Sequence, residues 1–163
     1  MSVPVVSVVG WANSGKTTFL EKLIAELKSR GYNVGIIKHH HDNVELDRPG
    51  KDTYRHAQAG ADAVIIASPQ KIGVVRKTSD EWPLEKLVEL LTDMDIVITE
   101  GYKRAATAKL EIYRQGVSPG PAADDKHLLA VISDGDLNRD VPVYNWNDAR
   151  GVADLLETKL LRC

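Results

Sequence analysis

The chain has 163 residues, of which 43% are apolar and 27% charged, and its formal net charge is −2. These values predict one soluble domain over residues 1–163 with a sizeable core, and they exclude a basic surface for nucleic acid. The single cysteine, Cys163, excludes an internal disulfide and is typical of a reducing cytosol. The sequence has no signal-peptide pattern and no apolar run of about 18 residues, so we expect a cytoplasmic protein outside the membrane.

Strand-like and helix-like patterns alternate along the chain, which predicts a mostly parallel sheet with helices on both faces. Between 63–67 and 72–75 the turn residues Ser68 to Lys71 predict an antiparallel hairpin, and Asp52 is the expected N-cap of a short helix. The segment 116–125, which is rich in proline and glycine, is expected to be a mobile loop. We expect strands at 3–9, 33–38, 63–67, 72–75, 96–99, 110–113, 128–132 and 141–144, and helices at 16–29, 52–59, 84–91 and 148–161.

The segment Gly10–Thr17 matches the pattern G-x-x-x-x-G-K-[ST] between the first strand and the first helix. Such a loop turns its backbone N–H groups toward phosphate at a helix N-terminus, so we expect the three-layer P-loop NTPase fold with a bound nucleoside triphosphate and Mg²⁺. Lys16 would contact the β- and γ-phosphates, and the Thr17 hydroxyl would ligate the metal. Gly10 and Gly15 would allow close approach of the backbone; the other expected phosphate contacts are Ala12, Asn13, Ser14 and Thr18.

Two acidic residues flank the strand 96–99, and ligands of open parallel sheets bind at the carboxyl ends of the strands. Glu100 lies at that end and is the expected metal-side acid, with a solvated loop acid as the alternative. Gly101 would let phosphate or a moving loop approach closely, whereas Asp95 is expected to cap a turn. The guanine-reading pattern Asn-Lys-x-Asp is absent, but Asp134 follows a late strand and could accept hydrogen bonds from guanine N1 and N2.

The loop after the second strand, His39 to Asp42, should also lie at the carboxyl edge. Its functional interpretations are a contact from Asp42 or Asp47 to a Mg²⁺-bound water, a hydrogen bond from His41, or a nucleotide-ordered switch segment. A transition-metal site is a further alternative, but adjacent histidines converge on one ion only with special backbone turns, so a solvated or phosphate-facing loop is favoured over it. Lys51 would contact phosphate or a second substrate, or would only be solvated beside a helix cap.

Several stretches together resemble the MobB family, the adaptors of molybdopterin-guanine dinucleotide biosynthesis. The stretches are Gly10–Thr18, His40 to Asp42, Asp47 with 49–53, 59–61 and 99–103, and the resemblance extends to about Tyr113. It implies slow GTP hydrolysis, a homodimer, and assistance to the MobA-like nucleotidyltransferase that joins GMP to molybdopterin. It also implies that Lys16 and Thr17 serve GTP–Mg²⁺ and that Glu100 and Asp42 line the same site.

Two other functions remain open on the same scaffold. A small-molecule kinase would recruit Arg104, Lys109 or Arg114, although these residues form no recognisable lid. A metallochaperone GTPase would use the histidines 39–41. Trp11, at the tip of the loop, would cover an apolar patch or contact a ligand or partner, and the hairpin 63–75 offers edges for pairing between subunits.

Overall fold

The computed structural model describes residues 3–161, apart from the side chain of Asp125; Cys163 lies outside this range. The chain divides into two compact units. The first unit runs up to His39 and resumes at Leu84, and the second is His40–Pro83. None of the helices within residues 3–161 is long and apolar enough to cross a membrane.

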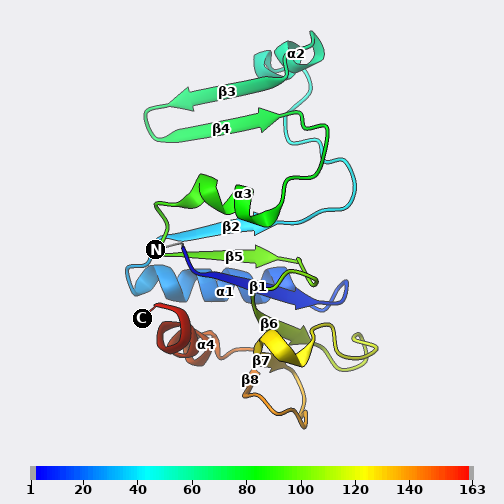
Figure 1. Ribbon diagram of the computed structural model, residues 1–163, viewed down its shortest axis with the longest axis vertical. Helices are drawn as coiled ribbons and strands as arrows, with labels where there is room; N and C mark the ends of the chain where they lie inside the picture. Colours follow the sequence, from blue (N-terminus) through cyan, green and yellow to red (C-terminus); the bar gives the residue numbers. More distant parts are fainter. Residues whose placement is uncertain (1–2, 162–163) are drawn as a thin grey trace. The chain divides into compact units, whose positions relative to one another are not determined.

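The first unit is built on a six-stranded sheet in the order β2-β5-β1-β6-β7-β8, and all neighbouring strands are parallel (Figure 1). This arrangement confirms the predicted parallel α/β fold and brings the carboxyl ends of the strands to one edge. The strands are β1 (Val5–Gly10), β2 (Val34–Lys38), β5 (Ile96–Glu100), β6 (Ala108–Tyr113), β7 (Leu128–Ser133) and β8 (Val143–Asn145).

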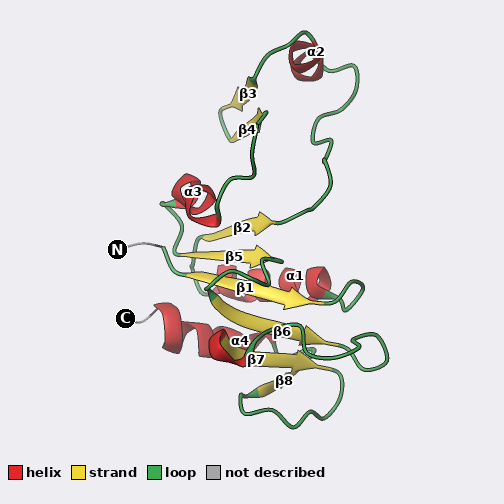
Figure 2. Cartoon of the chain, turned by 45° about the vertical axis from the view of Figure 1, so that its right-hand side comes forward, coloured by secondary structure: helices red, strands yellow, loops and turns green. Residues whose placement is uncertain are grey.

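Two helices, α1 (Lys16–Ser29) and α4 (Ala149–Leu156), pack together against one face of this sheet (Figure 2). Phe19, Leu23 and Val152 are fully buried in the resulting core. The helix α1 has the predicted bounds because it begins after one left-handed glycine, Gly15, and is followed by another, Gly31. The predicted last helix instead continues as a π-helical turn over Glu157–Leu161.

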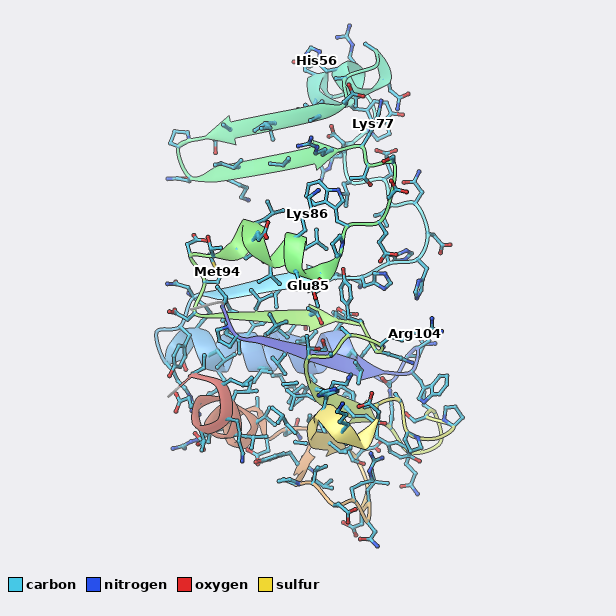
Figure 3. The ribbon with its side chains drawn as sticks, viewed as in Figure 1. His56, Lys77, Glu85, Lys86, Met94 and Arg104 are labelled. Carbon is cyan, nitrogen blue, oxygen red and sulfur yellow. The ribbon has the colours of Figure 1, made fainter. Side chains whose placement is uncertain are left out.

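The opposite face of the sheet is covered by the helix α3 (Leu84–Val88) with the 3₁₀ turn Glu89–Leu91, and by the loop that follows β6. A Cβ on Gly35 would lie 3.0 Å from Leu91 and 3.1 Å from Met94, which is labelled in Figure 3. Glycine at this position therefore lets the 84–94 segment approach the edge strand β2.

The second unit contains the helix α2 (Asp52–Gln58) and the antiparallel hairpin β3 (Ala63–Ser68) and β4 (Lys71–Arg76), which confirms the predicted hairpin. Its turn is shorter than expected, because Ser68 already pairs with Lys71. The prediction that Asp52 caps α2 is wrong: Lys51 occupies the cap position in an extended conformation, and no side chain caps the helix there. Lys77 ties the hairpin to α2 by donating from Nζ to the carbonyl oxygen of Ala57 at 3.1 Å (Figure 3).

Candidate functional site

The glycine-rich loop between β1 and α1 adopts the conformation that its sequence requires. Asn13 and Gly15 have positive φ angles of 59° and 89°, and the Ser14 N–H donates to the carbonyl oxygen of Trp11 at 3.2 Å. A Cβ on Gly10 would lie 2.7 Å from both the Ile112 carbonyl oxygen and the Ser14 Oγ. A larger residue at position 10 would therefore displace the loop from the neighbouring strand β6.

Lys16 is folded back onto the loop itself. Its Nζ donates to the carbonyl oxygen of Trp11 at 2.8 Å and to that of Gly10 at 3.3 Å. Burial lowers the pKa of Lys16 below its usual value; the charges of Lys103 and Lys38 lower it further, whereas Glu100 opposes them. An anion placed in the loop would relieve the repulsion among these three cations.

Glu100 ends β5 beside the loop, as the strand register Val8↔Glu100 requires. Its two carboxylate oxygens lie 3.2 and 3.3 Å from the Thr17 hydroxyl, and its Oε1 lies 3.4 Å from Lys38 Nζ. The Glu100 side chain is only 14% exposed, so it is not a solvated loop acid. Its role at a metal stays a prediction, but the structure brings it to the predicted partner Thr17.

The donors around this loop fit a triphosphate with Mg²⁺. A hydroxyl and a carboxylate are the hard oxygen ligands that Mg²⁺ prefers, and an amine and backbone N–H groups suit phosphate. The Ser14 Oγ is buried and has no hydrogen-bond partner among the residues that the structure describes. A phosphate oxygen in the loop would satisfy this orphaned hydroxyl.

Gly101 and Trp11 make close contacts within the first unit. Gly101 has a φ angle of 104°, and a Cβ there would lie 3.3 Å from His39 Cβ. The approach of phosphate or of a moving loop to Gly101 stays a prediction. The Trp11 Nε1 donates to the carbonyl oxygen of Gly120 at 2.8 Å, and Lys103 Nζ lies 4.2 Å from the centroid of the Trp11 ring. The indole therefore attaches the glycine-rich loop to the 116–125 loop.

A cavity of about 440 Å³ opens beside the glycine-rich loop, where β6, β7 and β8 end. Asp134 belongs to it, as its position after β7 predicted: its Oδ1 accepts from the Gln115 N–H at 2.9 Å. Sequence reasoning missed Asn145 at the end of β8 and the two residues that follow it, although the expected strand 141–144 places them at the same edge. The cavity is lined by Gly15, Thr18, Arg114, Asp134, Asn145, Trp146 and Asn147.

The remaining predicted site residues belong to the second unit. His41, Asp42 and Lys51 are exposed, and the Asp42 N–H donates to His40 Nδ1 at 3.2 Å. Their participation in nucleotide or metal binding stays a prediction. Within residues 3–161, no group of three or more histidine, cysteine, aspartate or glutamate side chains is arranged to hold a metal ion. The metallochaperone alternative stays an interpretation of the histidine run.

The three residues that a kinase would recruit differ in burial and in position. Lys109 is fully buried in β6, and its Nζ donates to the carbonyl oxygen of Ala105 at 2.9 Å. Arg104 is exposed in the loop after β5 (Figure 3), and Arg114 lines the cavity described above. A buried, hydrogen-bonded lysine cannot swing over a substrate as a lid residue does.

A parallel sheet with a glycine-rich loop between its central strand β1 and the helix α1 defines a P-loop-type fold. The family model "MobB: Molybdopterin guanine dinucleotide synthesis protein B" matches residues 5–134. The chain therefore belongs to the MobB family.

Relatives and solved structures agree with this assignment. Molybdopterin-guanine dinucleotide biosynthesis adapter proteins from Escherichia coli and Haemophilus influenzae are 37% and 34% identical to the chain. The alignments cover 94% of the chain and 91% of the first protein, and 97% of the chain and 90% of the second. The crystal structure of Bacillus subtilis MobB superposes with a TM-score of 0.76 at 28% identity, over 96% of this chain and 98% of that one.

Proposed function

We propose that the chain is a GTP-binding adapter protein of molybdopterin-guanine dinucleotide biosynthesis. It would assist the nucleotidyltransferase that attaches GMP to molybdopterin, and it would hydrolyse GTP slowly. Its membership of the MobB family supports the pathway. The observation that carries the nucleotide site is the contact of Thr17 with Glu100 beside the glycine-rich loop that holds Lys16.

Each residue of this site has a distinct task in the proposal. The backbone N–H groups of the loop and the Lys16 ammonium hold the phosphates, while the Thr17 hydroxyl and the Glu100 carboxylate supply oxygen ligands for Mg²⁺ or for its waters. Bound Mg²⁺ would neutralise phosphate charge. The family resemblance implies a further polar contact from Asp42, which belongs to the second unit; contacts from His41 and Lys51 stay predictions from the sequence.

Slow turnover follows from the kind of cation that surrounds Glu100. The charges that act on Lys16 there are those of Glu100 and of two further lysines, Lys103 and Lys38. An ammonium is a point charge without the planar fork of the guanidinium that stabilises the transition state in fast GTPases. A site that stores GTP and turns it over slowly suits an adapter protein better than it would suit a metabolic enzyme.

Calorimetric titration of GTP and of ATP, each with Mg²⁺, tests this proposal on the full chain. We expect a clear preference for GTP, and at least a tenfold loss of affinity in Lys16→Ala, because the charge contact to the β- and γ-phosphates is removed. Lys28→Ala, an exposed lysine at the far end of α1, is the matched control. A preference for ATP would instead favour the small-molecule kinase, and unchanged binding in Lys16→Ala would refute the phosphate site.

We also propose that the chain forms a homodimer through the hairpin β3–β4. Ile65, Ile72 and Val74 share one face of this two-stranded sheet and are 65%, 70% and 57% exposed. A two-stranded sheet with an uncovered apolar face is marginal alone and gains stability by pairing with a second copy.

The oligomeric state of a hairpin variant tests the dimer. The double substitution Ile72→Glu and Val74→Glu would bury charge in the interface. We therefore expect light scattering after size-exclusion chromatography to show a monomer. Leu90→Glu changes an equally exposed leucine, 67% exposed, outside the hairpin and serves as the control. A double variant that stays dimeric would place the interface elsewhere.

A further inference from the structure

We propose that the cavity beside the glycine-rich loop binds the guanine base, and that the segment Asn145 to Asn147, which begins at the last residue of β8, selects it. This inference rests on the proposed nucleotide function and adds residues to it. The cavity shares Gly15 and Thr18 with the phosphate loop and the start of α1. A nucleotide with its phosphates on the loop can therefore extend its base into the cavity, whose volume is typical of small-molecule sites.

Trp146 forms a rigid wall of this cavity. A Cβ built on Gly15 would lie 2.5 Å from both Cη2 and Cζ2 of the indole, so the ring edge sits directly against the glycine. The ring also packs near Phe19, with centroids 6.4 Å apart, and it belongs to the margin of the main core. An aromatic side chain fixed in this way offers a purine a flat apolar surface without losing rotamer freedom on binding.

Hydrogen bonds fix the orientation of two amide side chains in the cavity. The Asn145 Oδ1 accepts from the backbone N–H of Asn147 at 3.0 Å, and the Asn147 Oδ1 accepts from Lys22 Nζ at 2.7 Å. Both partners can only donate, so the oxygen of each amide must face them and the NH₂ group is directed elsewhere. The segment therefore presents amide donors to a cavity that Asp134 supplies with carboxylate acceptors.

This combination of donors and acceptors matches guanine and opposes adenine. Guanine carries donors at N1 and N2 next to the acceptor O6, so Asp134 can accept from the first two while an amide donates to O6. Adenine carries an acceptor at N1 and a donor at N6, which reverses the pattern. A carboxylate facing adenine N1 would leave both groups without a hydrogen bond.

The substitution Asn145→Asp tests the segment with little change of shape. It keeps the Oδ1 that accepts from Asn147 and replaces the NH₂ donor by an oxygen that would repel guanine O6. We expect GTP affinity to fall at least tenfold in calorimetry with Mg²⁺, whereas the affinity for inorganic tripolyphosphate should change less than threefold. Asn138→Asp adds the same charge in the β7–β8 connection, outside the cavity, and should leave both affinities unchanged.

A second measurement starts from the unmutated chain, and a variant serves only to assign the signal. GTP should change the tryptophan emission beyond the change that tripolyphosphate causes, and Trp146→Phe should remove this difference. Three outcomes would each overturn the base site while tripolyphosphate binding stands. They are equal GTP affinity in Asn145→Asp and the unmutated chain, equal affinity of the unmutated chain for ATP and GTP, and identical emission changes with GTP and tripolyphosphate. Failure of tripolyphosphate to bind the unmutated chain would refute the phosphate site, and the base site with it.

Discussion

The contact between Gly15 and Trp146 predicts an unusually large effect for the smallest possible substitution, Gly15→Ala. Gly15 has a φ angle of 89°, and an added methyl group would overlap the indole at 2.5 Å. Two penalties therefore act together. The left-handed backbone costs alanine about 1–2 kcal/mol, and insertion of a methyl group into a packed contact costs about 1–3 kcal/mol.

The sum is a loss of about 2–5 kcal/mol in the free energy of unfolding, a large part of the total stability of a domain. Gly31→Ala separates the two penalties, because Gly31 has a φ angle of 91° but no heavy atom of the described residues lies within 4 Å of its added Cβ. That control should lose only the backbone term of about 1–2 kcal/mol.

Urea unfolding followed by far-ultraviolet circular dichroism measures both variants, with the slope of free energy against urea used to check that the unfolded states are comparable. Introducing Trp146→Ala beside Gly15→Ala should remove the steric term and leave a coupling energy of about 1–3 kcal/mol. If Gly15→Ala costs no more than Gly31→Ala, the indole does not occupy the place described, and the wall of the base cavity is lost with it.

Three further outcomes follow from contacts of the first unit. Arg30 donates to Glu26 and to Asp154 at 2.7 Å. Arg30→Ala should therefore lower the free energy of unfolding, measured by urea unfolding, by about 1–3 kcal/mol. A loss no greater than that of the exposed control Lys28→Ala would contradict this linkage of α1 to α4. The pKa of Lys16 is lowered in the free chain, and bound phosphate would raise it, so triphosphate binding should take up a proton at alkaline pH below 10.5. Calorimetry in buffers of different ionisation enthalpy measures this uptake. If no proton is taken up, Lys16 is already fully protonated in the free chain and the reasoning is wrong. Glu100→Gln should slow Mg²⁺-dependent hydrolysis at least tenfold while weakening GTP binding less; equal losses in the phosphate-release and binding assays would indicate a structural role.

Local signals in the sequence were sufficient for the elements that are bounded by glycine. The helix α1 could be predicted to the residue because Gly15 and Gly31 take backbone angles that close its two ends. The position of Glu100 followed from the same logic, since a parallel sheet orders its carboxyl ends along one edge.

Residues whose roles depend on distant neighbours could not be read in this way. Asn145 and Asn147 are common polar residues at the end of a weak edge strand. Only their hydrogen bonds show which way each amide is turned and that its NH₂ group is left to donate elsewhere. The expected strand 110–113 began too late, because β6 already starts at Ala108 and includes the fully buried Lys109. Its ammonium is satisfied by the carbonyl oxygen of Ala105 and by Asp124, groups supplied by the loops before and after β6.

The buried carboxylate of Glu111 has a consequence for the loop that follows β6. Glu111 is fully buried and accepts from the backbone N–H groups of Ala122 and Ala123 at 2.7 and 3.4 Å. These loop amides can exchange with solvent deuterium only when their hydrogen bonds to Glu111 open, so we expect Ala122 and Ala123 to exchange more slowly than exposed amides of the same loop. Although its prolines and glycine mark this stretch as irregular, the buried carboxylate fastens its end to β6, and we expect a protease to cleave it more slowly there than in a loop without such contacts.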